Sequence, residues 1–248
     1  MRRKFFSAFK RWAPADQSSL AMLDTLIVPA SGPHRSSLIW LHGLGADCED
    51  FAFLPEFLSL PSSLGLRYVF PNAPKRPISL NGGMIMRAWY DIASGDLDRE
   101  GDLAGIDSSL TEVESLIEAE RALGIPPQNI LVGGFSQGSV LAIETLTQLG
   151  TKVGGAIALS GYLPRDEEKI PAAQPDQGTL FMAHGLEDSL IRPELGIRAR
   201  DALRRKGYEI HWSVWPIGHS VSEAELGALR DWLVDRLSRE PQRSAVVP

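Results

Sequence analysis

The stretch Ile130-Leu131-Val132-Gly133-Gly134-Phe135-Ser136-Gln137-Gly138 decides the fold that this sequence predicts. It begins as an apolar run typical of a buried strand and leads into Val140, Leu141 and Leu146, which suit the packed face of a helix. A sharp strand-to-helix turn exposes a serine hydroxyl, and glycines on both sides let the two elements approach closely. The stretch therefore predicts an α/β fold with Ser136 as a candidate nucleophile. An ordinary N-capping serine in a glycine-rich turn is the alternative.

The same alternation of strand and helix recurs along the whole chain. Short apolar runs alternate with helical patterns, which indicates a mainly parallel central sheet with helices on both faces. We expect about seven strands, at Leu23–Val28, Leu38–His42, Arg67–Phe70, Ile130–Phe135, Ala156–Ser160, Leu180–His184 and Ile210–Val214.

Helix boundaries are also visible in the sequence. Apolar residues at helical spacing from Ile106 to Leu123 predict a helix that ends at Gly124. Pro193 is expected in a first turn, and Ser222 with Glu225 has the spacing of a capping box. Residues 78–103 fit neither period, so we expect a long excursion or a small hairpin there.

Composition places the chain among ordinary globular proteins. It has 248 residues, of which 44% are hydrophobic and 23% charged. We expect one domain over residues 19–238, with a loose tail at 239–248. The net charge of −6 argues against nucleic acid as a partner. The single cysteine, Cys48, excludes an internal disulfide and a multi-cysteine zinc site, and it favours a reducing, cytoplasmic location.

Residues 1–18 form a basic amino-terminal arm. Five Lys and Arg residues and no acid lie in the first twelve positions, with Phe5, Phe6, Phe9 and Trp12 among them. Arranged as a helix, this segment would make a weak contact with an anionic membrane surface. A loosely ordered basic tail is the alternative. The apolar run of a secretory signal is missing from this stretch.

A serine nucleophile needs a base and a group that orients the base. In a strand–turn–helix hydrolase these follow the serine in the order acid, then histidine. Among the five histidines, His219 alone lies in a loop between the last expected strand and the last helix, so it is the predicted base. The loop after Leu180–His184 offers two acids, Glu187 and Asp188.

The loop that follows the strand at Leu38–His42 is expected to donate to an oxyanion. His42-Gly43-Leu44-Gly45 has two glycines, which allow a backbone N–H to turn toward the serine. The start of the helix after Ser136 provides further unpaired N–H groups. An ordinary turn at the end of a strand is the alternative at the first position.

Taken together, these motifs resemble the phospholipase/carboxylesterase family of α/β-hydrolases, which includes acyl-protein thioesterases and bacterial carboxylesterases. The resemblance is carried in order by Leu41–Asp47, Gly134–Gly138, His184–Asp188 and Pro216–Ser220, and a block from Asn81 to Asp91 is similar to the bacterial esterases. It covers most of Ser36–Leu237. Cys48, in place of a usual glycine, and Arg192, in place of a usual proline, depart from the family pattern.

The resemblance implies an α/β-hydrolase fold and a Ser136–Asp188–His219 triad, so it favours Asp188 over Glu187. It implies an oxyanion hole made by the N–H groups of Leu44 and Gln137, and neither cofactor nor metal. The expected reaction is hydrolysis of a small ester or acyl substrate, either an oxygen ester or a thioester. A non-catalytic relative that binds an acyl ligand or a protein is the rival interpretation.

The irregular segment at residues 78–103 contains candidate residues for the substrate pocket. Trp89, Met84 and Met86 offer apolar area suited to a flexible acyl chain, with ordinary core packing as the alternative. Cys48 is interpreted as a partly buried apolar residue and not as a nucleophile, because no histidine follows it in a matching context.

Overall fold

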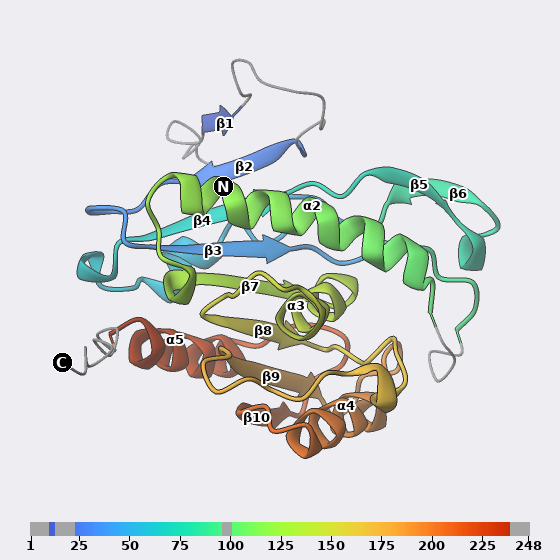
Figure 1. The fold of residues 1–248 in the computed structure, drawn as a ribbon. Helices are drawn as coiled ribbons and strands as arrows, with labels where there is room; N and C mark the ends of the chain where they lie inside the picture. Colours follow the sequence, from blue (N-terminus) through green and yellow to red (C-terminus); the bar gives the residue numbers. More distant parts are fainter. Residues whose placement is uncertain (1–9, 13–22, 96–100, 239–248) are drawn as a thin grey trace.

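A computed structural model describes residues 10–12, 23–95 and 101–238, which are organised around an eight-stranded sheet (Figure 1). From one edge to the other, its strands are β1 (Lys10–Trp12), β2 (Thr25–Val28), β4 (Leu66–Pro71), β3 (Ser36–Leu41), β7 (Ile130–Phe135), β8 (Gly155–Leu159), β9 (Thr179–Gly185) and β10 (Ile210–Trp215). Every neighbouring pair from β4 to β10 is parallel, whereas β2 runs antiparallel to both β1 and β4.

The seven strands expected from the sequence are all present, and β1 is an eighth. It lies inside the predicted basic arm and pairs with the free edge of β2, with Arg11 opposite Leu26. At these three positions the chain is extended, so the helical arrangement considered for the arm does not hold there. The rest of the arm and the tail at 239–248 lie outside the described residues, and the division into arm, domain and tail remains a prediction.

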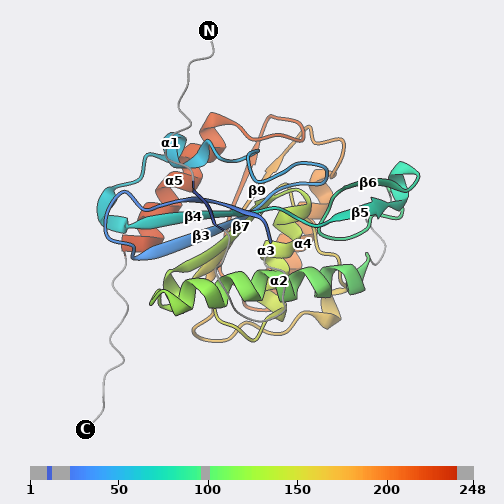
Figure 2. The ribbon, with the colours of Figure 1, turned by 90° about the horizontal axis from the view of Figure 1, so that it is seen from above.

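Helices cover both faces of the sheet, as expected. Helices α1 (Leu54–Leu58) and α5 (Glu223–Ser238) lie on one face, and α2 (Leu103–Ala122), α3 (Gln137–Gln148) and α4 (Pro193–Arg205) lie on the other (Figure 2). Short 3₁₀ turns occupy Ser62–Leu64, Ser79–Asn81, Pro127–Asn129 and Glu167–Lys169. No helix of the described ranges is long and apolar enough to cross a bilayer.

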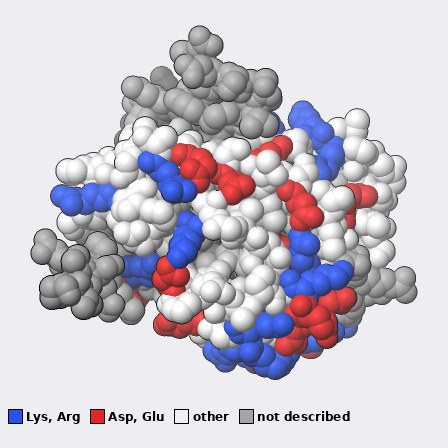
Figure 3. All heavy atoms as spheres, in the orientation of Figure 1, with Lys and Arg blue, Asp and Glu red and all other residues white. Residues whose placement is uncertain are grey.

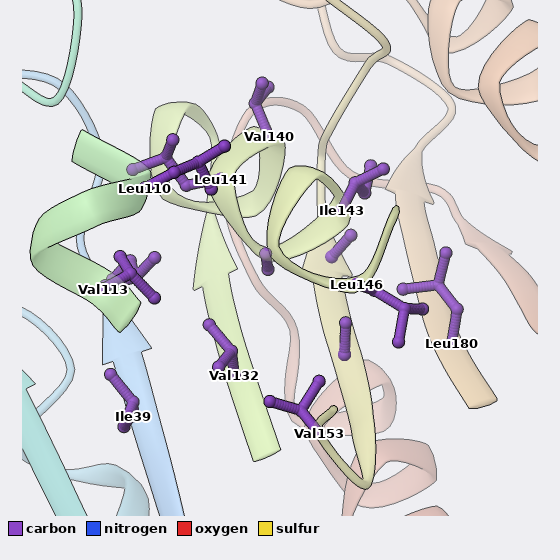
Figure 4. Packing of buried hydrophobic residues seen from close by; sticks show 14 of the residues in the cluster. Ile39, Leu110, Val113, Val132, Val140, Leu141, Ile143, Leu146, Val153 and Leu180 are labelled. Atoms are coloured by element: carbon purple, nitrogen blue, oxygen red, sulfur yellow. The ribbon is translucent and has the colours of Figure 1, made fainter. Parts of the chain in front are cut away.

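Two apolar clusters hold these layers together, one on each side of the sheet. On the α3 side, Val140, Leu141, Ile143 and Leu146 of α3 belong to one cluster with Leu110 of α2 and Val132 of β7, and Leu141 lies beside Leu110 (Figure 4). Strands β3 and β7 are almost wholly buried because both of their edges and both of their faces are covered. The middle of the sheet is therefore a rigid base for the loops at its carboxyl edge.

Helix ends follow the local sequence. The capping box of α5 is present: the Glu225 N–H donates to Ser222 Oγ at 3.1 Å, and the Ser222 N–H donates to a Glu225 carboxylate oxygen at 3.3 Å. Pro193 stands at the start of α4, as expected. Asp102 caps α2, which the sequence analysis did not predict, by accepting from the Gly105 N–H at 2.9 Å.

The irregular region forms the expected small hairpin, a separate antiparallel pair of strands, β5 (Lys75–Ile78) and β6 (Met84–Arg87). The hairpin projects beyond the carboxyl ends of the parallel strands (Figure 1). Charged residues of both signs are interspersed over the face seen in Figure 3 and gather over α4.

Candidate active site

Ser136 lies at the tight turn between β7 and α3. Its backbone has φ of +55° and ψ of −119°, a conformation that L-residues with a side chain rarely adopt. The turn is tight because Gly134 and Gly138 approach the chain of β3: a Cβ on Gly138 would lie 2.1 Å from the Leu41 carbonyl oxygen. The Ser136 N–H donates to the Leu159 carbonyl at 2.9 Å, which fixes the turn to β8.

Three predicted residues meet at the carboxyl edge of the sheet. His219, in the loop between β10 and α5, has Nε2 2.9 Å from Ser136 Oγ and Nδ1 2.7 Å from Asp188 Oδ2. An ionised carboxylate only accepts hydrogen bonds, so the Nδ1 of His219 carries the proton. Nε2 is then free to accept from the serine hydroxyl, the arrangement that general-base catalysis requires.

The Asp188 carboxylate is buried and fully supported. Only 3% of the residue is exposed, and its Oδ1 accepts from the N–H groups of Leu190 at 3.0 Å and Ile191 at 2.9 Å. These bonds leave Oδ2 for His219. Glu187, the alternative acid, is exposed and contributes only its backbone to this region, through a bond from its N–H to the Ile217 carbonyl.

Three other histidines, His34, His42 and His211, lie away from the serine. His211 is on the exposed side of β10, stacked on Phe181, and His34 bonds to Ser37. His42 is buried behind the loop that follows β3, where its Nε2 accepts from the Ala73 N–H and its Nδ1 donates to the Gly43 carbonyl. Burial lowers the pKa of His42, which keeps it neutral.

A cavity of about 570 Å³ opens beside the serine and histidine. Its floor contains Tyr90 and Tyr162, both nearly fully buried with hydroxyls 3.0 Å apart, and its rim contains Leu80 and Leu190, which are largely exposed. The lining residues are Gly43, Leu44, Ala46, Asp50, Leu80, Tyr90, Ile92, Gly95, Phe135, Ser136, Gln137, Tyr162, Ser189, Leu190, Ile191 and His219. A largely apolar cavity with a few polar groups suits an acyl chain.

The predicted oxyanion donors both border this cavity. Leu44 lies in the loop after β3, and Gln137 is the first residue of α3, where backbone N–H groups lack partners within the helix. The Gln137 side chain holds the neighbouring segment in place: its Oε1 accepts from the Trp89 N–H at 2.8 Å, and its Nε2 donates to the Tyr90 carbonyl at 2.7 Å.

The structure places the predicted pocket residues differently from our expectation. Trp89 is fully buried, with its indole N–H donating to the His42 carbonyl, so it supports the loop behind the cavity. Met84 is 63% exposed on the hairpin and Met86 is half-buried near Gly45, and neither lines the cavity. The segment contributes other residues to the cavity: Leu80, from the turn between β5 and β6, and Tyr90 and Ile92, which follow β6.

Sequence reasoning found Leu44, Ser136, Gln137 and His219 at this cavity but missed several of its other lining residues. Leu190 and Ile191 come two and three residues after Asp188, and this closeness to the predicted acid is the one sequence signal that could have placed them at the cavity. Tyr162 follows β8 with no motif around it. Cys48 is buried, as expected, and its thiol contacts the Asn72 amide at 3.3 Å. Burial raises the pKa of this thiol, which disfavours the reactive thiolate.

The sequence profile of the phospholipase/carboxylesterase family matches residues 23–235. The chain belongs to this family. Its fold is accordingly the α/β-hydrolase fold, with the mainly parallel sheet and flanking helices described above.

Relatives cover nearly the whole chain. Acyl-protein thioesterase 1 of Neurospora crassa is 36% identical over 92% of this chain and 97% of its own length. Acyl-protein thioesterase 1 of Yarrowia lipolytica is 35% identical over 85% of this chain and 96% of its own. The crystal structure of Zea mays acyl-protein thioesterase 2 superimposes with a TM-score of 0.74 at 29% identity, covering 86% of this chain and 98% of that one.

Proposed function

We propose that this protein is a serine hydrolase that cleaves carboxylic esters and thioesters through an acyl-enzyme on Ser136. The observation that carries the proposal is the continuous hydrogen-bond chain from Ser136 Oγ through His219 to Asp188 at the mouth of a largely apolar cavity. Family membership and the names of the thioesterase relatives support the class of bond.

In the acylation step, His219 Nε2 accepts the Ser136 proton while Oγ attacks the substrate carbonyl carbon. The negative charge moves to the carbonyl oxygen. The imidazolium then donates its proton to the leaving oxygen or sulfur as the bond to the carbonyl carbon breaks. Asp188 stabilises the imidazolium and holds Nδ1–H in place, while remaining ionised.

In the deacylation step, water replaces the alcohol or thiol. His219 accepts a proton from water, the resulting hydroxide adds to the acyl carbon, and the same proton returns to Ser136 Oγ as the acid leaves. The products are a carboxylic acid and the alcohol or thiol, so the reaction needs no co-reactant other than water.

The oxyanion of each tetrahedral intermediate would be held by the N–H groups of Leu44 and Gln137. Both residues border the cavity beside Ser136, and the amino terminus of α3 adds positive potential at this point. Loss of one such donor typically costs about 3–4 kcal/mol of transition-state stabilisation.

Substitution of the nucleophile tests the proposal against the rival, a non-catalytic acyl-binding relative. We expect Ser136→Ala to lower kcat for a p-nitrophenyl ester and for a matched thioester by at least about 10⁴-fold. Ser115→Ala, on the exposed face of α2, is the matched control and should behave as wild type. A folded Ser136→Ala protein that turns over like wild type would contradict the proposal and favour the binding protein.

Three further proposals concern the location of the protein, its reactants and its amino-terminal arm. We propose a cytoplasmic location because the single cysteine allows no internal disulfide. We expect no metal or cofactor to take part, because the proposed steps are carried by side chains and water. We also propose that the basic arm makes a weak contact with anionic membrane surfaces.

A further inference from the structure

A second histidine lies directly behind the acid. His184, at the carboxyl end of β9, is 1% exposed. Its Nε2 is 2.8 Å from the Ile191 carbonyl oxygen and 3.6 Å from Asp188 Oδ2. A carbonyl oxygen can only accept, so Nε2 carries a proton and donates it to Ile191.

The other ring nitrogen fixes the charge state of His184. Nδ1 is buried and has no hydrogen-bond partner within the described ranges. Gly196 of α4 lies against it, because a Cβ on Gly196 would be 2.4 Å from Nδ1. The charged or titratable groups that act on the ring are Asp188, His219 and Glu194. Burial outweighs the two acids and lowers the pKa of His184, so the ring is the neutral Nε2–H tautomer.

Ile191 connects this ring to the Asp188 carboxylate. The Ile191 carbonyl accepts from His184, and the Ile191 N–H donates to Asp188 Oδ1 at 2.9 Å. The same oxygen accepts from Leu190 at 3.0 Å. The ring thus holds the turn that presents two N–H groups to one carboxylate oxygen and leaves the other oxygen facing His219.

We propose that His184 is a positioning residue for the acid: its neutral ring, held between Gly196 and Ile191, fixes the turn that aims Asp188 at His219. This inference rests on the proposed triad, in which the orientation of Asp188 determines that of the base. A neutral N–H dipole 3.6 Å from Oδ2 also favours the ionised carboxylate without adding a competing positive charge.

Paired substitutions test the role. His184→Leu removes the donor at similar volume, whereas the amide of His184→Gln can donate in place of Nε2. We expect His184→Leu to lower kcat by about 10²-fold with little change in KM, the scale typical of misplaced catalytic groups, and to shift the acidic limb of the kcat/KM profile. His184→Gln should restore most of kcat.

A control and a second test variant separate positioning from loss of stability. Met182→Ala, a buried substitution on the same strand, should destabilise the fold and leave the pH profile unchanged. Gly196→Ala leaves every polar group of the site intact but forces the His184 ring to move, so it should reproduce the kinetic defect of His184→Leu. If His184→Leu does not fold, Gly196→Ala and His184→Gln still decide the question.

A spectroscopic readout makes the inference independent of turnover. In protein carrying ¹⁵N-histidine, we expect His184 to remain the neutral Nε2–H tautomer and His219 to show a downfield Nδ1–H proton, which weakens in His184→Leu and in Gly196→Ala. This can be measured in the Ser136→Ala background, so failure of the proposed function and failure of this inference are distinguishable. Wild-type kcat, pH profile and Nδ1–H resonance in His184→Leu, or no recovery in His184→Gln, would overturn it.

Discussion

Ser136 combines exposure of its hydroxyl with backbone strain. A non-glycine residue at φ of +55° and ψ of −119° costs on the order of 1–3 kcal/mol, which the packing of β7, β8 and α3 must offset. The strained turn is needed for the proposed reaction, because it places Oγ of Ser136 beside Nε2 of His219. Stability and activity are therefore opposed at this residue.

Glycine at this position should relieve the strain. We expect Ser136→Gly to raise the free energy of unfolding by about 1 kcal/mol relative to Ser136→Ala, while both variants are inactive. Alanine is the matched control because it removes the hydroxyl and keeps the Cβ. Denaturant unfolding of the two proteins provides the measurement, and equal stability would show that the turn is not strained.

Because the Glu225 carboxyl is buried, we expect the free energy of unfolding to depend on pH. Burial raises its pKa from 4.5 to about 7, and one carboxylate oxygen has no partner within the described ranges. Between these values the folded chain binds more protons than the unfolded chain, so this group's contribution to stability is lost as pH rises from about 4.5 to about 7. At 1.36 kcal/mol per pKa unit, the upper limit is about 3 kcal/mol.

Glu225→Gln should remove this loss while keeping the capping acceptor for Ser222. The variant is expected to be more stable than wild type at pH 8, with a smaller difference at pH 5. The matched control is Glu223→Gln, an exposed acid in the same turn. Thermal or denaturant unfolding at several pH values measures the effect, and a wild type that gains stability between pH 5 and 7 relative to Glu225→Gln would contradict it.

The sequence predicts the role of a residue where that role can be recognised from the order of residues and elements along the chain. Ser136 and His219 follow from loop placement and order. Asp188 was favoured over Glu187 only with help from the family resemblance, because burial separates them and burial is a tertiary property. His184 resembled any residue at a strand end, since its partner, the Ile191 carbonyl, is a backbone group with no sequence signal.

At the scale of elements, the approach of α3 to β3 is the critical contact. Gly138 has no side chain because the Leu41 carbonyl occupies that space, 2.1 Å from where a Cβ would stand. We expect Gly138→Ala to push α3 away from the sheet, with loss of activity and several kcal/mol of stability. The shift would also move the Gln137 N–H from the proposed oxyanion site.

Gly227 of α5 is the matched control for Gly138. It lies within a helix and a Cβ there would meet nothing within 4 Å. Gly227→Ala should therefore raise the free energy of unfolding by about 0.5–1 kcal/mol, the usual helix-propensity gain. Calorimetry on both variants measures the contrast, and similar effects of the two substitutions would refute the close-packing argument.

Elements with strong local patterns were predictable, and those created by long-range pairing were not. Seven strands, the hairpin at β5–β6 and the capping box of α5 follow from apolar runs, glycines and the Ser222–Glu225 spacing. Strand β1 was missed because Lys10–Trp12 is short and basic, and it forms only against the edge of β2. The predicted pocket role of Met84 and Met86 was wrong, because the placement of the hairpin relative to the cavity is set by tertiary packing.

At the scale of the whole molecule, the proposed site and the amino-terminal strand are separated. Ser136, Asp188 and His219 follow β7, β9 and β10, whereas β1 lies at the opposite edge of the sheet, beyond β2 (Figure 1). The three residues thus lie at the carboxyl ends of β7, β9 and β10, whereas the β1 edge belongs to the basic arm. The arm and the hydrolytic reaction should therefore be independent.

Deletion of residues 1–9 tests this independence and keeps β1. We expect hydrolysis of a soluble ester to be unchanged within about twofold. Binding to anionic vesicles should weaken, since three basic residues are removed at roughly 1 kcal/mol each near the surface. Zwitterionic vesicles are the control. Unchanged binding to anionic vesicles would instead support the loosely ordered tail.

The most direct test of the central claim is covalent labelling with a fluorophosphonate, followed by peptide mapping. A serine activated by His219 should be modified stoichiometrically, with the adduct on Ser136 and its formation slowed by orders of magnitude in His219→Ala. An active preparation that is left unlabelled, or is labelled at Cys48 or another residue, would contradict the account.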